Sequence, residues 1–163
     1  PSGLHAFAPG ALLHSRPCVG VVLVYVCELT KRQYRGKKLR EIRGPDDVVS
    51  IVGPKLHREQ REHFLVLLLN ARHEVVARET VSVGSLNASI VHPREVFRPA
   101  VLASAAAIVL VHNHPSGDPE PSEEDLSITK RLVQAGELLG ISVLDHVIVA
   151  GRGVVSLRAR QML

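Results

Sequence analysis

The sequence has few aromatic residues, few cysteines and no long apolar run. Aromatic residues make up 3% of the 163 residues, and tryptophan is absent. A core must therefore be built mostly from Leu, Val, Ile and Ala, and 45% hydrophobic residues suffice for one globular domain plus an appendage. The only cysteines, Cys18 and Cys27, are interpreted as small buried groups or free thiols in a reducing compartment, and we assign them no chemistry.

Signals for membrane insertion and secretion are also missing. The longest apolar candidate, residues 19–27, is far too short to span a membrane. Residues 1–17 contain no basic cluster followed by an apolar region and a small-residue cleavage site, so we expect no signal peptide. The sequence therefore predicts a cytoplasmic protein without a membrane partner. Gly151-x-Gly153 lacks the third glycine and the helix of a dinucleotide-binding fingerprint and indicates only a turn.

Charge is distributed unevenly along the chain. Residues 1–43 contain eight Lys or Arg against two Glu, a net charge of +6, whereas residues 44–163 contain 12 against 14 acids, a net charge of −2. This basic segment is dense enough to contact the phosphates of DNA, although a solvated linker is the interpretation that we favour. Its apolar residues 21–24 and 26 would be exposed unless they dock on a neighbouring chain, which leaves a homodimer open.

The most informative stretch runs from His112 to Asp125 and reads His-Asn-His-Pro-Ser-Gly-Asp-Pro-Glu-Pro-Ser-Glu-Glu-Asp. It lies between an apolar, β-branched segment typical of a buried strand, residues 105–111, and residues with helical apolar spacing. Alternate side chains of a strand share a face, so His112 and His114 point the same way. Two imidazoles from the strand and the carboxylate of Asp125 from the helix can therefore meet. Such a set, with a fourth position left for water, is typical of a catalytic zinc site.

A purely structural interpretation explains part of this stretch. Ser122-x-x-Asp125 matches a capping box, in which the serine caps the helix and the acid reaches back. Acidic residues also suit a helix N-terminus because its dipole favours negative charge. Capping does not explain paired histidines at the end of an apolar strand, where polar groups are costly unless they have partners. Metal binding therefore remains the better interpretation.

The same residues resemble a known family. His-x-His, seven residues, Ser, two residues and Asp is the metal motif of the JAMM (MPN+) metallopeptidases, and His-Asn-His-Pro-Ser-Gly-Asp-x-x-Pro-Ser-x-x-Asp resembles the RadC branch. Flanking segments resemble that branch too, namely residues 62–64, 92–97 and 144–146. The resemblance implies an α/β fold, a JAB/MPN-type (cytidine-deaminase-like) mixed β-sheet flanked by helices, over residues 44–163. Residues 1–43 would be a linker or the remnant of a preceding helical domain, although no helix-hairpin-helix motif is visible in them.

The resemblance also implies roles for particular residues. His112, His114 and Asp125 would bind Zn²⁺, and Ser122 would hydrogen-bond the water or the developing oxyanion. The general base of such enzymes is a glutamate on an early strand, which matches Glu62. Glu95 is its competitor, but Glu95 also fits the first turn of a helix.

Two neighbouring residues and one substitution complete the candidate site. We interpret His146 as a core residue or a residue beside a ligand, and Asp145 as a carboxylate that could orient a ligand imidazole. Asn113 stands between the two histidines, where many deubiquitinating JAMM enzymes carry Ser or Thr. This supports the RadC branch and argues against a ubiquitin-like substrate.

Two classes of function follow. The first is a zinc-dependent hydrolase that cleaves a peptide or isopeptide bond in a peptide or protein substrate by metal-activated water, with Glu62 as general base. The alternative is an accessory module of DNA repair or recombination in which the metal site is structural or vestigial. A metal-dependent nuclease is a third reading, but such sites often use two metals and more carboxylates than the sequence places here.

Periodicity and turn residues predict the remaining elements. We expect an Asp N-cap before a helix over residues 48–52, a short helical piece over 55–60, and a helix over 92–102 that Pro99 kinks or shortens. The helix after the motif should end at Gly140. Strands are expected over residues 62–69, 74–83, 105–111, 142–150 and 154–157, with a strand remnant at 90–91 and a helix over 19–34.

Overall fold

The computed structural model describes residues 40–53, 56–84 and 91–163. Expectations for residues 1–39, including the helix over 19–34 and most of the basic segment, lie outside these ranges. None of the described helices is long and apolar enough to cross a membrane. The elements in chain order are α2 (Pro45–Val52), η1 (Leu56–Arg58), β1 (His63–Leu69), β2 (Val75–Val83), α3 (Pro93–Leu102), β3 (Ala107–His114), α4 (Glu123–Leu139), β4 (Ser142–Ala150) and β5 (Gly153–Ser156).

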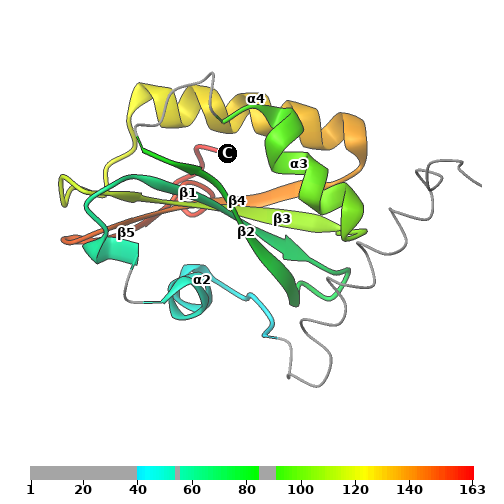
Figure 1. Ribbon diagram of the computed structural model, residues 1–163, viewed down its shortest axis with the longest axis horizontal. Helices are drawn as coiled ribbons and strands as arrows, with labels where there is room; N and C mark the ends of the chain where they lie inside the picture. The colour runs from blue at the N-terminus through cyan, green and yellow to red at the C-terminus, as the bar shows by residue number, and fades with distance from the viewer. Residues whose placement is uncertain (1–39, 54–55, 85–90) are drawn as a thin grey trace, which may run out of the picture.

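The strands form one five-stranded mixed sheet in the order β2-β1-β3-β4-β5. β1 pairs antiparallel with β2 and with β3, β3 runs parallel to β4, and β4 pairs antiparallel with β5. Helices α3 and α4 cover one face of the sheet, and α2 covers the other (Figure 1). The mixed α/β sheet flanked by helices that the sequence predicts is confirmed.

Two apolar clusters fill the space between the sheet and its helices. One joins side chains of β1 and β3, such as Phe64 and Leu110, to residues of α3 and α4 that include Val96 and Leu132. The other joins the opposite side chains of the same strands to Val48 and its neighbours on α2. Because both faces are covered, β1 and β3 are apolar at almost every position rather than at alternate ones.

Most predicted boundaries agree with the structure to within two residues, and the exceptions are the end of β3, which lies at His114 rather than residue 111, and the start of α2. Helix α2 begins at Pro45, three residues before the expected start, and its N-cap is Gly44, which makes no side-chain capping bond. The expected aspartate cap is therefore wrong. The fixed φ of proline and its missing N–H suit the first helical position, so Asp46 and Asp47 lie inside the first turn.

Three further expectations concern single residues. Pro99 lies inside α3, but the helix continues to Leu102. Gly140 ends α4 in the left-handed conformation with φ of 67°, as expected for a glycine in that place. Val91 is not part of a strand, and its neighbour at position 90 lies outside the described residues.

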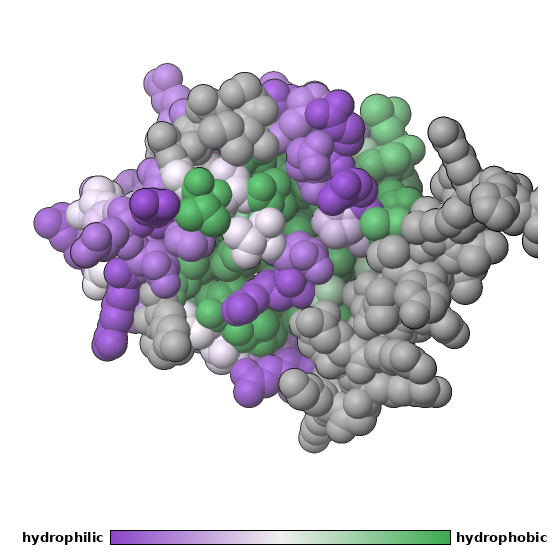
Figure 2. All heavy atoms as spheres, in the orientation of Figure 1, coloured by the Kyte–Doolittle hydropathy of each residue, from purple (hydrophilic) through white to green (hydrophobic). Residues whose placement is uncertain are grey.

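Hydrophilic side chains gather at one end of the molecule, on the left in Figure 2. In the same orientation, the β3–α4 loop and the β4–β5 turn lie at that end (Figure 1). His112 and His114, near the end of β3, and the first residues of α4 lie at this end of the molecule.

Candidate metal centre

The centre forms where β3 ends and α4 begins. His112 and His114 are alternate residues of β3 and therefore point to the same face, the one that α4 covers. Asp125 lies in the first turn of α4. One ligand atom from each of the three residues lies within 4.8 Å of the others. Among the described residues, this is the only group of His, Cys, Asp or Glu side chains placed to hold a metal ion.

The proton on His114 can be assigned from its surroundings. Its Nδ1 lies 2.8 Å from the backbone carbonyl oxygen of Asp118. Because a carbonyl only accepts hydrogen bonds, Nδ1 donates, and the neutral ring keeps a lone pair on Nε2. This Nε2 lies 2.7 Å from Nε2 of His112 and 3.3 Å from Oδ2 of Asp125. The lone pair therefore points at the place where the three side chains meet.

The carboxylate of Asp125 is almost completely buried, with 2% of its surface exposed. Its Oδ2 accepts hydrogen bonds from the backbone N–H and the hydroxyl of Ser122, both at 2.7 Å. The Ser122 hydroxyl in turn accepts a bond from the Asp125 backbone N–H, which completes the capping box that the sequence predicts. The other oxygen, Oδ1, lies 3.1 Å from Nε2 of His112 and faces the metal centre.

The electrostatics of the centre favour a cation. Burial alone would raise the pKa of Asp125, but the neighbouring imidazoles of His112 and His114 and the hydrogen bonds from Ser122 hold this pKa far below its ordinary range. The hydrogen bond to Asp125 raises the pKa of His114, against the effect of partial burial. The anionic carboxylate thus attracts a proton onto the imidazole when no other cation competes.

The donor set fits a divalent transition metal. Two imidazole nitrogens and one carboxylate oxygen are the ligands of many catalytic zinc sites, and the same set also suits other first-row metals. Ser122 and the carbonyl of Asp118 hold the outer atoms of Asp125 and His114, and such partners orient metal ligands. The donor types and the partners that hold them therefore fit a metal ion.

Glu62 lies beside this centre. The sequence predicts that the strand starts at Glu62, whereas β1 starts one residue later, at His63. Glu62 is partly buried. It lines a cavity of about 310 Å³ together with His114 and Asp125. The other residues around this cavity are Ser116, Asp118, Glu120, Ser122 and Glu124. Glu62 thus shares this cavity with two of the three residues of the cluster.

The competing glutamate lies elsewhere. Glu95 is in the first turn of α3, forms an ion pair with Arg94 at 3.0 Å, and is not among the residues that line the cavity. The geometry therefore favours Glu62 as the acid near the metal. Ser122 lines the cavity, and its hydroxyl donates a hydrogen bond to Asp125. Its role toward a water or an oxyanion stays a prediction.

Asn113 has a structural task that the sequence did not reveal. Its side chain points to the face opposite the histidines and is fully buried. The amide oxygen accepts from the backbone N–H of His63 at 2.7 Å, and the amide nitrogen donates to the carbonyls of Arg61 at 3.0 Å and Glu59 at 3.4 Å. These bonds fix the segment on both sides of Glu62. The residue between the two candidate metal ligands thereby holds the segment that carries the candidate base.

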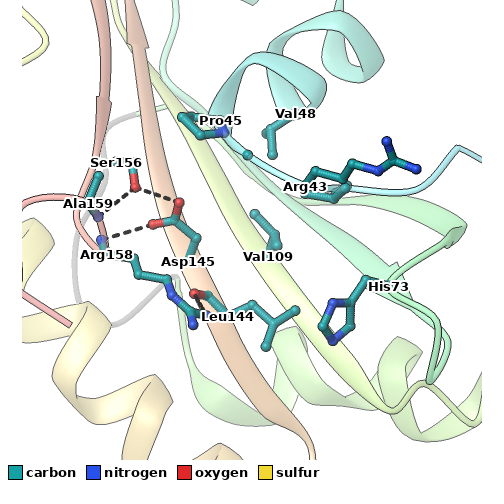
Figure 3. Close-up of a pocket in the computed structure, with 12 residues that line it drawn as sticks. Arg43, Pro45, Val48, His73, Val109, Leu144, Asp145, Ser156, Arg158 and Ala159 are labelled. Carbon is teal, nitrogen blue, oxygen red and sulfur yellow. Dashed lines mark hydrogen bonds between the residues drawn. The ribbon is translucent and has the colours of Figure 1, made fainter.

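The expected role of Asp145 is wrong. Its carboxylate accepts bonds from the hydroxyl of Ser156 at 2.6 Å and from the backbone N–H of Arg158 at 3.1 Å (Figure 3). Because consecutive residues of a strand point to opposite faces, Asp145 faces α2, whereas His146 faces the metal centre. His146 contacts the ligand imidazole instead, with its Nε2 2.8 Å from Nδ1 of His112. Complete burial, and next the nearby His112, lower the pKa of His146 well below its ordinary value.

A second cavity, of about 480 Å³, lies on the α2 face of the sheet (Figure 3). Val48, Val109 and Leu144 form its apolar lining, and Arg43 and Arg158 bring positive charge to it. Arg158 donates to the Leu144 carbonyl, and Arg43 pairs with Glu41. These polar groups are thus engaged within the protein, and we assign the cavity no chemistry.

Comparison with known proteins identifies the family. A model of the RadC-like JAB domain matches residues 42–162. The chain belongs to the RadC-like JAB domain family. A UPF0758 protein of Desulforamulus reducens is 54% identical over 122 residues, which is 75% of this chain and 54% of that protein. UPF0758 proteins of Listeria welshimeri and Methanosarcina mazei are 55% and 50% identical over 119 residues, which is 73% of this chain and 53% and 52% of those proteins.

The chain spans about half the length of the curated relatives that it matches. The JAB superfamily includes metallohydrolases, and this member carries a His-His-Asp group that can hold a metal ion.

Proposed function

We propose that this domain is a zinc-dependent hydrolase of the JAMM type that cleaves a peptide or isopeptide bond. The observation that carries the proposal is the convergence of three ligand atoms, from His112, His114 and Asp125, beside a cavity that Glu62 lines together with two of these residues, His114 and Asp125. A bound zinc supplies a Lewis acid for the scissile carbonyl and lowers the pKa of water at the site. The side chains around it must then hold the substrate and move protons.

Glu62 is the proton carrier in this proposal. It accepts a proton from the attacking water and delivers it to the leaving amine, for which its place on the cavity wall is suited. Asn113 accepts a hydrogen bond from His63 and donates one to Arg61, and these bonds on both sides of Glu62 limit the movement of its backbone. This arrangement separates two carboxylates by role, because Asp125 binds the cation and Glu62 manages a proton.

The test compares three variants of the full chain for zinc stoichiometry and for cleavage of a panel of peptides and isopeptides. Glu62→Gln keeps the shape but removes the proton acceptor, so zinc should stay bound while hydrolysis falls by roughly 10²–10⁴-fold. Asp125→Ala should lose zinc because a ligand is gone. Glu95→Gln is the matched control and should cleave like the parent protein. If Glu95→Gln is inactive while Glu62→Gln cleaves normally, the assignment of the base is wrong.

A nucleic-acid function is the second candidate, and the basic composition of residues 1–43 is the observation that favours it. The cavity beside the metal centre is unfavourable for a phosphate group, because the five carboxylates that line it would repel an anion. DNA would therefore bind through the N-terminal segment. Such binding should weaken steeply as salt rises, whereas hydrolysis should instead stop when a chelator removes the metal.

A further inference from the structure

A chain of buried hydrogen bonds leads away from the metal centre. Nδ1 of His112 lies 2.8 Å from Nε2 of His146, and Nδ1 of His146 lies 2.6 Å from the hydroxyl of Thr129. That hydroxyl lies 2.6 Å from the backbone carbonyl oxygen of Asp125. His112, His146 and Thr129 are each at most 1% exposed. The chain therefore starts at one metal ligand, crosses from β3 to β4 and α4, and returns to the residue that provides another.

The direction of every bond follows from counting protons. The Asp125 carbonyl can only accept, so Thr129 donates its single hydroxyl proton to it. The Thr129 oxygen must then accept from His146, which places the proton of that ring on Nδ1. A neutral His146 consequently presents a lone pair on Nε2, and His112 must donate to it from Nδ1.

The consequence falls on the other nitrogen of His112. A neutral imidazole carries one N–H, so a proton on Nδ1 leaves a lone pair on Nε2, the atom that faces Asp125 and His114. The opposite direction would be harmful. If His146 carried its proton on Nε2, His112 would be protonated on Nε2, which could then not bind a metal.

We propose that His146 and Thr129 are positioning residues that set the tautomer of His112 and so prepare its Nε2 to bind the metal. The inference rests on the proposed metal site and adds residues to it that lie outside the ligand motif. Phe64 supports the arrangement, because its ring is nearly parallel to that of His112 and edge-on to that of His146. The distances between ring centroids are 6.1 Å to His112 and 5.5 Å to His146. The two imidazoles thus have little freedom to rotate out of the hydrogen-bonded chain.

The test measures the dissociation constant for Zn²⁺ by competition with a chromophoric chelator. Thr129→Val keeps the shape of the side chain but removes the hydroxyl, and His146→Leu removes both ring nitrogens. Each should weaken zinc binding by roughly 10–100-fold, the usual effect of losing an outer partner of a metal ligand. Thr129→Ser retains the hydroxyl and His146→Gln retains an acceptor and a donor, so both should bind zinc more tightly than the first pair.

Ile128→Val is the matched control. Ile128 is buried on the same helix, next to Thr129, and the substitution removes apolar volume without touching the hydrogen bonds. It should bind zinc like the parent protein. Equal zinc affinity in Thr129→Val, His146→Leu and Ile128→Val would overturn the proposal. If the parent binds zinc and the first pair is weakened, but no peptide or isopeptide is cleaved, the positioning role stands and the hydrolase proposal fails.

A spectroscopic readout does not depend on the variants folding. Nitrogen-15 resonances of the histidine rings report which nitrogen carries the proton. In the parent protein, His146 should be protonated on Nδ1 alone, and zinc-loaded His112 should be protonated on Nδ1 with the metal on Nε2. A proton on Nε2 of His146 would overturn the proposal. A parent protein that binds no zinc would overturn both this inference and the metal centre.

Discussion

Asn113 offers a sharp test of how the sheet positions Glu62. Truncation in Asn113→Ala removes one acceptor and two donors from a fully buried position. The N–H of His63 loses its partner, which costs about 1–3 kcal/mol for a buried group. The carbonyl of Arg61 belongs to an exposed residue, so water can replace part of that bond, and its loss costs about 0.5–1.5 kcal/mol. The contact with Glu59, at 3.4 Å, adds little.

The free energy of unfolding should therefore fall by about 2–4 kcal/mol, measured by urea denaturation. Zinc affinity should change little, because His112 and His114 are retained and their outer partners are untouched. Hydrogen exchange at the His63 amide should accelerate, and hydrolysis should fall because the segment that carries Glu62 loosens. Asn113→Asp keeps the acceptor for His63 but removes both donors, so the His63 amide should remain protected in that variant.

Ser82→Ala is the matched control. Ser82 is buried on β2, and its hydroxyl has no hydrogen-bond partner among the residues that the structure describes. Removing it should change the stability by less than about 0.5 kcal/mol. If Asn113→Ala is as stable as Ser82→Ala, or if the His63 amide stays protected in Asn113→Ala, the reasoning on Asn113 is refuted.

Three further outcomes are expected. Gly136→Ala should lower the free energy of unfolding by about 1–3 kcal/mol in urea denaturation, because a Cβ would lie 2.5 Å from the carbonyl oxygen of Ile141. This loss should outweigh the better helix propensity of alanine. Unchanged stability would contradict this close approach. Ser122→Ala should keep the fold but lower its stability by about 1 kcal/mol, because the substitution removes the helix cap. It should also weaken zinc binding, because it removes a hydrogen-bond partner of Asp125. Unaltered zinc affinity would show that the cap does not orient the ligand. In the metal-free protein, the raised pKa of His114 stabilises the fold at pH values below the pKa of this histidine in the unfolded chain, and this stabilisation is lost as the pH rises through the pKa in the folded protein. Zinc affinity should increase over the same pH range, because zinc binds the neutral imidazole. Calorimetry with and without zinc at several pH values checks both signs.

The strands were predictable because their sequence signal is local. β1 and β3 are nearly continuous apolar runs, and both runs follow from burial on two faces. The start of α2 was harder, because Pro45 and the two following aspartates both signal a helix start, and only the observed backbone shows that proline occupies the first position.

The order of the strands has no comparable signal. β1 lies directly beside β3 in the sheet, although β2 and α3 separate the two strands in the sequence. This pairing depends on contacts between residues more than 35 positions apart, such as Phe64 and His112. Periodicity describes one element at a time, so it indicates which face of a strand is buried but not which strand lies beside it.

The same limit applies to the metal centre. The clustering of His112, His114 and Asp125 could be predicted because one short stretch contains all three, and strand alternation plus one helical turn brings them together. His146 is 34 positions from His112, and Asn113 contacts residues 50 to 54 positions away. Thr129 did offer a signal, since it lies four residues after Asp125 and therefore on the same face of α4.

Asp125 also shows why a capping box and a metal ligand need not be competing interpretations. Ser122 binds Oδ2 and thereby fixes the carboxylate, while Oδ1 faces the histidines. A cation at this place meets the positive end of the α4 dipole, an unfavourable contact of about 0.3–1 kcal/mol at an exposed helix end. The acids Glu123, Glu124 and Asp125 in the first turn offset this cost. The capping motif therefore both starts the helix and supplies negative charge at the place proposed for the metal ion.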